Sequence, residues 1–292
     1  MTLLRAEWEG RRLDSDPLLF PHRYRSAEDR ELVAFIASSL AFGRVASIQS
    51  SLERVLSALG PSPAGFLDAW HGEAIPGLAR FKHRWVTRED LRRFLNAVRR
   101  ARNEHGSLRN LFAAGDHGEP DYVPALDRFY GQLTYLTGND TFELPHGLRF
   151  LLPQPGEGSA CKRAHLFLRW MVRDRDVDLG LWSGHHFRAD RLLLPMDTHV
   201  HRISRYLGIT RRATADLIAS REATQWLRRI DTDDPVSFDW ALSRLGILAE
   251  CSREITRSHC ERCAVRPVCR ETLVPYEPSE ERSSEPSSAA AS

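Results

Sequence analysis

The chain has 292 residues, enough for one large domain or two modest ones, and its apolar share of 42% is ordinary for a soluble globular protein. The N-terminal stretch has no sustained apolar run and no small-residue cleavage pattern, so we expect neither a signal peptide nor a membrane span. We therefore expect a cytoplasmic location. The net charge is only +2, but five Glu and one Arg follow residue 270, which leaves residues 1–270 with a charge of +6.

The basic residues are unevenly placed. Residues 82–102 hold eight Lys or Arg against two acidic residues, and residues 202–229 have a similar excess. Such stretches suit a phosphate backbone, because each neutralised phosphate releases counterions, although solvated helix faces have the same composition. Charge alone therefore leaves both interpretations open. Only Lys82 and Lys162 are lysines, against 39 arginines, which marks Lys162 in particular as a position that needs a primary amine.

Apolar residues recur at helical spacing along much of the chain, and no convincing alternating strand pattern occurs. A central helix is predicted from the apolar residues of 32–40. A second helix covers 48–59 and ends at the Gly-Pro pair that follows. A third begins with a capping box of Thr87 and Asp90 and stops at Gly106. The sequence therefore predicts an all-α fold.

The remaining segments are less regular. Residues 116–140 are predicted to be loops that join short helices. Asp234 and Pro235 match an N-cap followed by the first helical residue, and the apolar stripe behind them leads into Cys251. Residues 276–292 are rich in Pro, Ser and Glu, which predicts a disordered acidic tail outside the fold.

A glycine-containing turn precedes a predicted helix that begins near Lys162. The turn holds Gly156 and Gly158, and a turn that opens a helix can present backbone N–H groups to a phosphate. Within the helix, basic residues follow one another at spacings of three, four and four, so they share a face separate from the apolar one. This predicted basic stripe consists of Lys162, His165, Arg169 and Arg173.

Another helix is predicted to begin after Pro195. Asp197 or Thr198 is its N-cap, and Gly208 ends it. An aspartate at this position can be an N-cap without any catalytic function. The residues by themselves therefore leave both interpretations of Asp197 open, helix capping and catalysis.

Four of the five cysteines form a cluster with the spacing C-x8-C-x2-C-x5-C: Cys251, Cys260, Cys263 and Cys269. In a cytoplasmic protein this pattern indicates thiolate ligands rather than disulfides. Zinc is the main alternative, but structural zinc sites usually combine two tight pairs, and here only one pair is tight. The uneven spacing favours a [4Fe–4S] cluster.

Three features together resemble the endonuclease III superfamily of helix-hairpin-helix DNA glycosylases. They are the GxG turn before Lys162, the segment LPMDTHVHRISRYLGI, and the four-cysteine loop. The segments GSACKRAHLFLRWMVR and DPVSFDWALSRLGILAEC are still more similar to a bacterial and archaeal branch known as a domain of unknown function. The resemblance covers about residues 31–269.

The resemblance implies a helix-hairpin-helix glycosylase-like fold of two helical lobes within residues 1–275. One lobe is expected to contain about 30–155 and 196–235, and the other to contain the remainder with the termini. The four-cysteine loop, 251–269, would follow the last helix.

The resemblance also implies functions for single residues. Lys162 corresponds to the Schiff-base lysine of these enzymes and Asp197 to their catalytic aspartate. Burial and the neighbouring cations Arg163 and His165 are expected to lower the pKa of Lys162, which must be neutral to act as a nucleophile. The expected DNA contacts are Gly156, Gly158, Arg163, His165, Arg169, His199 and Arg202.

The implied function is the removal of a damaged base that is flipped out of double-stranded DNA, with or without strand cleavage, by a monomeric protein. The alternative is a non-catalytic iron–sulfur protein that binds nucleic acid. The altered hairpin and a missing amide motivate it: Gly158 lies four residues before Lys162 rather than two, and Phe42 and Arg44 stand where these glycosylases often place an amide side chain that enters the emptied base stack. A further departure is an insertion at residues 174–194. The insertion belongs either to a lesion-reading loop or to a surface excursion, on the basis of its Trp182, His185, His186 and Phe187.

Overall fold

The computed structural model describes residues 13, 16–138, 144–184, 186–247, 251, 260–261, 263 and 265–270. Its fold is all-α, as predicted, except for one hairpin in which β1 (Lys82–His83) pairs antiparallel with β2 (Val86–Thr87). The helices are α2 (Leu19–His22), α3 (Ala27–Ser39), α4 (Val45–Leu59), α5 (Pro63–Ala69), α6 (Arg88–His105), α7 (Leu108–Gly115), α8 (Val123–Leu136), α9 (His146–Leu151), α10 (Lys162–Val172), α11 (Thr198–Tyr206), α12 (Leu217–Leu227) and α13 (Asp239–Ile247). Short 3₁₀ turns are η1 (Pro76–Leu78), η2 (Pro155–Glu157), η3 (Ala189–Arg191) and η4 (Arg266–Val268). Within the described part of the chain, no helix is long and apolar enough to cross a membrane.

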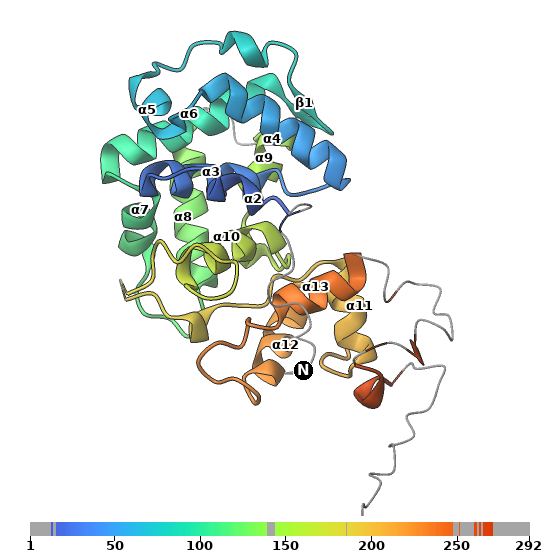
Figure 1. The fold of residues 1–292 in the computed structure, drawn as a ribbon. Coiled ribbons are helices and arrows are strands. Elements are labelled where there is room, and N and C mark those ends of the chain that lie inside the picture. Colours follow the sequence, from blue (N-terminus) through green and yellow to red (C-terminus); the bar gives the residue numbers. More distant parts are fainter. Residues whose placement is uncertain are drawn as a thin grey trace, which may run out of the picture.

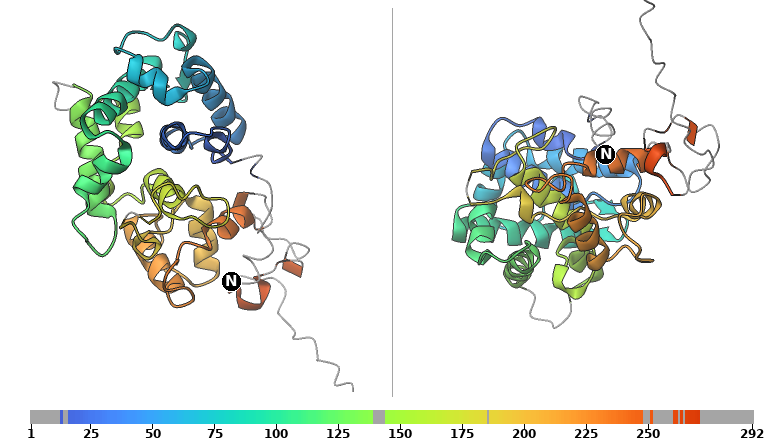
Figure 2. Two further views of the ribbon diagram at one scale, coloured as in Figure 1. Left: turned by 60° about the vertical axis from the view of Figure 1, so that its left-hand side comes forward. Right: turned by 90° about the horizontal axis from the view of Figure 1, so that it is seen from below.

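The buried side chains form two main clusters, one in each of two lobes (Figure 1). The first lobe contains α2 to α10, and its cluster comes almost entirely from residues 18–192. The second lobe contains α11 to α13, and its cluster comes almost entirely from residues 194–245. Figure 2 shows both lobes from two further directions. The prediction that 196–235 would join 30–155 in one lobe is therefore wrong, because the apolar faces of α11 and α12 pack together with α13.

Short-range signals place several helix boundaries where the sequence predicted them. The Thr87 side chain accepts a hydrogen bond from the Asp90 N–H, and the Asp90 carboxylate accepts one from the Thr87 N–H at 2.8 Å, so the capping box of α6 is confirmed. Gly106 follows the end of this helix with a φ of 79°, in the left-handed region that favours glycine. The central helix is also confirmed, because residues 31–39 of α3 are all buried.

Two expectations for the irregular segments are wrong. Residues 116–140 contain α8, whose Leu126, Phe129 and Leu133 are buried at helical spacing. The last predicted helix begins at Asp239, not directly after Asp234, because the Asp234 carboxylate bonds to Arg173, the residue that follows α10, instead of capping.

The insertion that follows α10 closes the core of the first lobe. The indole of Trp182 is 1% exposed and donates to Oε1 of Glu31 at 2.8 Å. Its ring stacks on Phe112 with centroids 5.4 Å apart, and it meets Phe167 edge-on at 5.3 Å and Phe187 at 5.5 Å. Both interpretations of Trp182 and Phe187, a lesion-reading loop and a surface excursion, are therefore wrong.

A buried ion network joins α10 to the second lobe. Arg169 bonds to Asp178 at 3.0 Å and also to Asp239. Arg173 bonds to Asp178 and, at 2.9 Å, to Asp234. All five side chains are buried, so loss of one partner would leave a charge uncompensated, which costs about 3–5 kcal/mol in such settings.

Candidate active site between the two lobes

Lys162 and Asp197 meet where the two lobes join. Lys162 is the first residue of α10, and Asp197 is the N-cap of α11. The Lys162 Nζ lies 2.8 Å from Oδ2 of Asp197, and the two side chains are 31% and 19% exposed. Two residues from distant segments therefore form a partly buried ion pair that solvent can still reach.

Asp197 uses its two carboxylate oxygens for different partners. Oδ1 accepts from the backbone N–H of His199 at 2.9 Å and of Val200 at 2.8 Å, which confirms the predicted N-cap, while Oδ2 faces Lys162. Burial alone would raise the pKa of Asp197, but the charge of Lys162 and the hydrogen bonds outweigh burial, so the pKa lies below its usual value. Asp197 is therefore an anion at neutral pH.

The protonation of Lys162 differs from the expectation. Burial acts to lower the pKa of Lys162, but the carboxylate of Asp197 outweighs it and the pKa is raised. The Arg163 guanidinium is directed elsewhere and donates to the carbonyls of Ser39 and Phe150. The predicted lowering is wrong for the resting protein, in which Lys162 is an ammonium.

Both side chains line one cavity of about 650 Å³, within the usual range for small-molecule sites. Its walls come from the α3–α4 loop, the first turn of α4, α10, the start of α11, and α13. Three acidic side chains line it, Asp16, Asp197 and Asp239, beside several Lys and Arg. The cavity lies between the lobes, so residues from both contribute to any chemistry inside it.

Asp239 is a second buried carboxylate in this cavity that the sequence did not single out. It begins α13, is 3% exposed and bonds to Arg169. Burial raises the pKa of Asp239 to about 6, against the opposing charges of Arg169 and Lys162. A group that titrates near neutrality beside an amine suits proton transfer. An acidic residue in the first turn of a helix is common, so no local pattern distinguished it.

Two of the expected DNA contacts are buried. His165 is 1% and Arg169 is 2% exposed, so the predicted basic stripe is not a surface. Burial lowers the pKa of His165 to about 4, which leaves it uncharged at neutral pH. Arg169 is held by Asp178 and Asp239. The prediction that His165 and Arg169 contact DNA is therefore wrong.

The turn before α10 also differs from the predicted phosphate site. The Gly156 N–H donates to Oδ1 of Asp127 at 2.7 Å, so a carboxylate occupies this N–H, and the phosphate contact of Gly156 stays a prediction. Gly158 adopts a left-handed conformation with a φ of 91°, and its carbonyl accepts from Leu217 at 3.0 Å. Its phosphate contact stays a prediction. Arg163 lines the cavity, but its guanidinium bonds to backbone carbonyls, contrary to the expected DNA contact.

The two predicted contacts on α11 have different surroundings. His199 lines the cavity, and its Nδ1 is buried without a hydrogen-bond partner among the described residues. Its contact with DNA stays a prediction. Arg202 instead donates from Nη2 to the carbonyl of Cys251 at 2.6 Å, which directs its guanidinium to the four-cysteine segment rather than to DNA.

The four cysteines lie at one end of the second lobe. Cys251, Cys263 and Cys269 pack against its apolar cluster. Burial raises the pKa of Cys251 to about 11, with Arg202 opposing the rise and the three other thiols adding to it. Among the described residues, no three His, Cys, Asp or Glu side chains form a ready group that could hold a metal ion. The other three thiols are near enough to Cys251 to act on its pKa, but these described side chains do not form a ready ligand group, and the cofactor stays a prediction.

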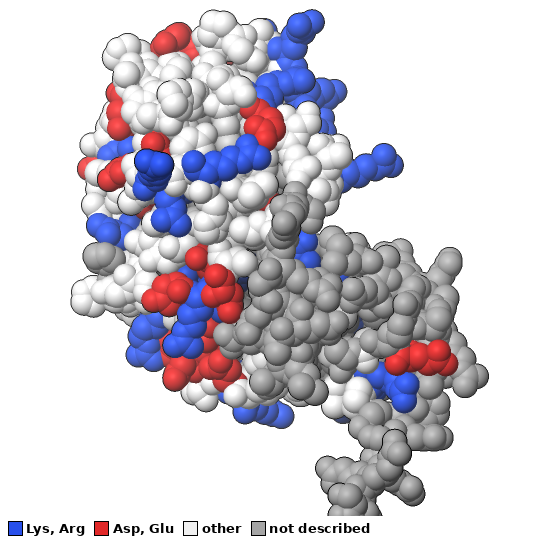
Figure 3. All heavy atoms as spheres, in the orientation of Figure 1, with Lys and Arg blue, Asp and Glu red and all other residues white. Residues whose placement is uncertain are grey.

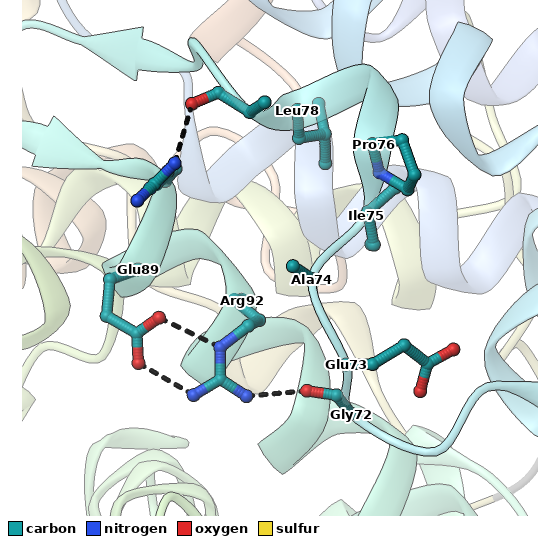
Figure 4. A pocket seen from close by; sticks show the side chains of 10 residues that line it. Gly72, Glu73, Ala74, Ile75, Pro76, Leu78, Glu89 and Arg92 are labelled. Atoms are coloured by element: carbon teal, nitrogen blue, oxygen red, sulfur yellow. Dashed lines mark hydrogen bonds and ion pairs between the residues drawn. The ribbon is translucent and has the colours of Figure 1, made fainter.

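A second cavity of about 480 Å³ lies between the segment 72–79 and α6 (Figure 4). Arg92 crosses one side of it and is fully engaged, with two bonds to Glu89 at 2.7 and 2.8 Å and one to the carbonyl of Gly72 at 2.6 Å. Arg88 donates to the carbonyl of Ala79 at 3.2 Å. The polar side chains that line this second cavity therefore hold the segment 72–79 in place. We assign no chemistry to this cavity.

Comparison with curated proteins and with solved structures gave no match. A family model does match, and its range of residues 16–248 includes both lobes, Lys162 and Asp197 and ends before Cys251. The chain therefore belongs to the family described as "Protein of unknown function (DUF2400)".

Proposed function

We propose that this protein is a DNA-repair enzyme, a base-excision DNA glycosylase with lyase activity. The observation that carries the proposal is the Lys162–Asp197 pair, 2.8 Å apart, in a cavity open to solvent. An amine next to a carboxylate supplies a nucleophile and the base that activates it. The proposed substrate is a damaged nucleotide flipped out of double-stranded DNA, because its sugar carbon cannot be reached inside the duplex.

The ion pair has to become a neutral pair before Lys162 can react. A flipped nucleotide that fills the cavity displaces water, which disfavours both charges and promotes transfer of a proton from Nζ to Oδ2 of Asp197. The neutral amine then attacks C1′ of the sugar. The N–C1′ bond forms as the glycosidic bond breaks, and the base leaves with the electron pair and takes up the proton. The C1′–O4′ bond then breaks, O4′ takes the proton that Nζ gives up, and a protonated imine forms between Nζ and C1′. Loss of a proton from C2′ to solvent, with departure of the 3′-phosphate, then breaks the strand by β-elimination.

The arrangement of neighbouring elements supports the proposal. The turn of residues 152–161 joins α9 to α10, so the proposed nucleophile opens the second helix of a helix-turn-helix unit, as the resemblance to helix-hairpin-helix glycosylases implies. Asp197 caps α11 directly after a Pro-Met pair, also as that resemblance implies.

The proposal includes a resident [4Fe–4S] cluster held by Cys251, Cys260, Cys263 and Cys269. Three of these side chains pack on one apolar cluster, and the other three thiols lie close enough to Cys251 to act on its pKa. A [4Fe–4S] cluster takes four thiolates. When bound, it would fix the segment that Arg202 links to α11, so its function here is structural. Zinc is the alternative metal.

Borohydride trapping tests the enzymatic proposal. The protein is incubated with a panel of damaged duplexes, and reduction of the imine leaves a covalent protein–DNA adduct. We expect the adduct at Lys162, and its loss in Lys162→Gln. Lys82→Arg is the matched control, since it removes the other lysine of the chain and should trap normally. No adduct and no base release on any lesion would overturn the proposal.

A second candidate function is nucleic-acid binding without catalysis. It is favoured by the resting charge of Lys162 and by the Gly156 N–H, which a carboxylate occupies. This function predicts that Asp197→Asn complements a deletion strain as well as the wild type does. The enzymatic proposal predicts that the same variant fails to complement while it still binds DNA.

A further inference from the structure

The β1–β2 hairpin is fixed at the rim of the cavity. His83 holds it to the neighbouring segments, since one ring nitrogen bonds to the carbonyl of Phe42 at 3.0 Å and the other to Oγ of Ser51 at 2.9 Å. At the tip, the side chain of Arg84 passes so close to Gly43 that a Cβ there would lie 3.2 Å from its Cδ. Because Phe42 also lines the candidate active-site cavity, the hairpin and the cavity share a wall.

A group of aromatic rings extends from this wall. We call Phe42, Trp85, His146 and Phe150 the aromatic platform. Trp85 stacks on Phe42 with centroids 5.4 Å apart, and Phe150 meets both edge-on at 4.8 and 4.5 Å. His146 lies 5.6 Å from Trp85. His146 is exposed and the other three are half-buried, so the platform is an open surface rather than part of the core.

Exposed cations surround the platform. The Arg84 guanidinium carbon lies 4.6 Å from the centre of the Trp85 ring. In Figure 3, Lys and Arg side chains gather along the edge of the first lobe where Figure 1 shows β1 and α4. None of these exposed cations makes an ion pair with a described residue: Arg44, Lys82, Arg84 and Arg149.

Two further details distinguish the platform from an ordinary surface patch. The indole N–H of Trp85 is buried and has no partner among the described residues, which is unusual for a buried donor. Arg84 has a φ of 55°, in the left-handed region where residues with a Cβ are uncommon. Such conformations concentrate at sites where a side chain must be presented in one direction. Here the direction is over the face of Trp85.

We propose that the aromatic platform binds an unpaired nucleotide of a DNA strand beside the active-site cavity. The base stacks against Trp85 in place of the Arg84 guanidinium, which moves to the phosphate. Stacking on aromatic rings together with nearby cations is how proteins hold single strands of any sequence. A fully paired duplex offers no free base face, so this site selects DNA that is opened next to the nucleotide in the cavity. The inference rests on the proposed function for its substrate.

Binding to paired and unpaired DNA tests this site. Fluorescence anisotropy at one fixed salt concentration would compare a labelled duplex with the same duplex carrying a short unpaired segment. Trp85→Leu keeps the apolar bulk but removes the ring. We expect it to weaken binding of the opened duplex by about tenfold and to leave the paired duplex within about twofold, because stacking is lost. Trp85→Phe should restore most of the loss. Tyr135→Leu is the control, since this tyrosine on α8 is 74% exposed.

Arg84→Ala gives an independent measurement of the phosphate contact. It should lower the salt dependence of opened-duplex binding by about one phosphate contact, whereas Arg229→Ala, in the exposed turn after α12, should not. Equal affinities of wild type and Trp85→Leu for the opened duplex would overturn the platform while borohydride trapping at Lys162 could still succeed. A wild-type protein that binds neither DNA would overturn both the platform and the proposed function.

Discussion

Asp197 performs two separable tasks, and Asn and Ala substitutions distinguish them. Asp197→Asn keeps an oxygen that can cap α11 but removes the charge that faces Lys162. At 2.8 Å the attraction between unit charges is about 6 kcal/mol for an effective dielectric constant of about 20, most of which desolvation and side-chain ordering offset. A net loss of about 1–2 kcal/mol remains, as for other hydrogen bonds between charged groups. Asp197→Ala should lose about 1 kcal/mol more, because the cap is also removed.

Urea unfolding at neutral pH measures both differences. The wild type, Asp197→Asn, Lys162→Met and the double variant form a cycle that isolates the pair. We expect a coupling energy of about 1–2 kcal/mol between Lys162 and Asp197. A coupling energy below about 0.3 kcal/mol would refute the reasoning, since the two charges would then not interact across the cavity. Asp197→Ala no less stable than Asp197→Asn would refute the assignment of the cap.

Three further predictions concern other parts of the chain. Burial raises the pKa of Asp239 to about 6, above the pKa of about 4 for an aspartate in an unfolded chain. The protonated Asp239 carboxyl therefore contributes its full stabilisation below about pH 4, and this stabilisation is lost as the pH rises through about 6. The wild type should therefore lose about 2–3 kcal/mol relative to Asp239→Asn between pH 4 and pH 7, and parallel urea-unfolding curves would contradict this. Cys251→Ser should lose iron and acid-labile sulfide, whereas Cys161→Ser, a change at the fifth cysteine, should retain both. Equal iron in the two variants would exclude Cys251 as a ligand, and wild-type protein without iron and sulfide would exclude the cluster. Thr87→Ala should lower the free energy of unfolding by about 1 kcal/mol, because the side-chain cap of α6 is lost, and should leave borohydride trapping unchanged. Thermal unfolding measures this loss, and an unchanged midpoint would contradict the prediction.

Patterns of short range were predicted correctly from the sequence. The capping box at Thr87 and Asp90 and the N-cap at Asp197 are confirmed because each depends on residues within one helical turn. The contact between Lys162 and Asp197 is different in kind, since no local pattern brings distant segments together. Only the family resemblance pointed to a joint site, and the structure places the two side chains 2.8 Å apart.

The wrong predictions depend on partners that are distant in the sequence. The spacing of the stripe on α10 was correct, but spacing does not say whether a face is exposed. Arg169 is buried because Asp178 and Asp239 neutralise it from two other segments. The division into lobes failed for the same reason, since it depends on which apolar faces meet. In α8, a Pro in the first turn opens a helix of 14 residues, whereas the prediction was of loops that join short helices.

The buried ion network and the candidate site have a helix in common. Lys162 and Arg169 lie two turns apart on α10, so they share a face, and they hold Asp197 and Asp239 respectively. Apolar residues of similar volume would join the lobes at least as firmly, so stability alone does not account for these buried charges. Arg169 instead fixes the start of α13, and with it Asp239, against the cavity. A tilt of the second lobe would move both carboxylates relative to the amine. The joint between the lobes and the geometry of the site therefore depend on the same side chains and cannot be altered separately.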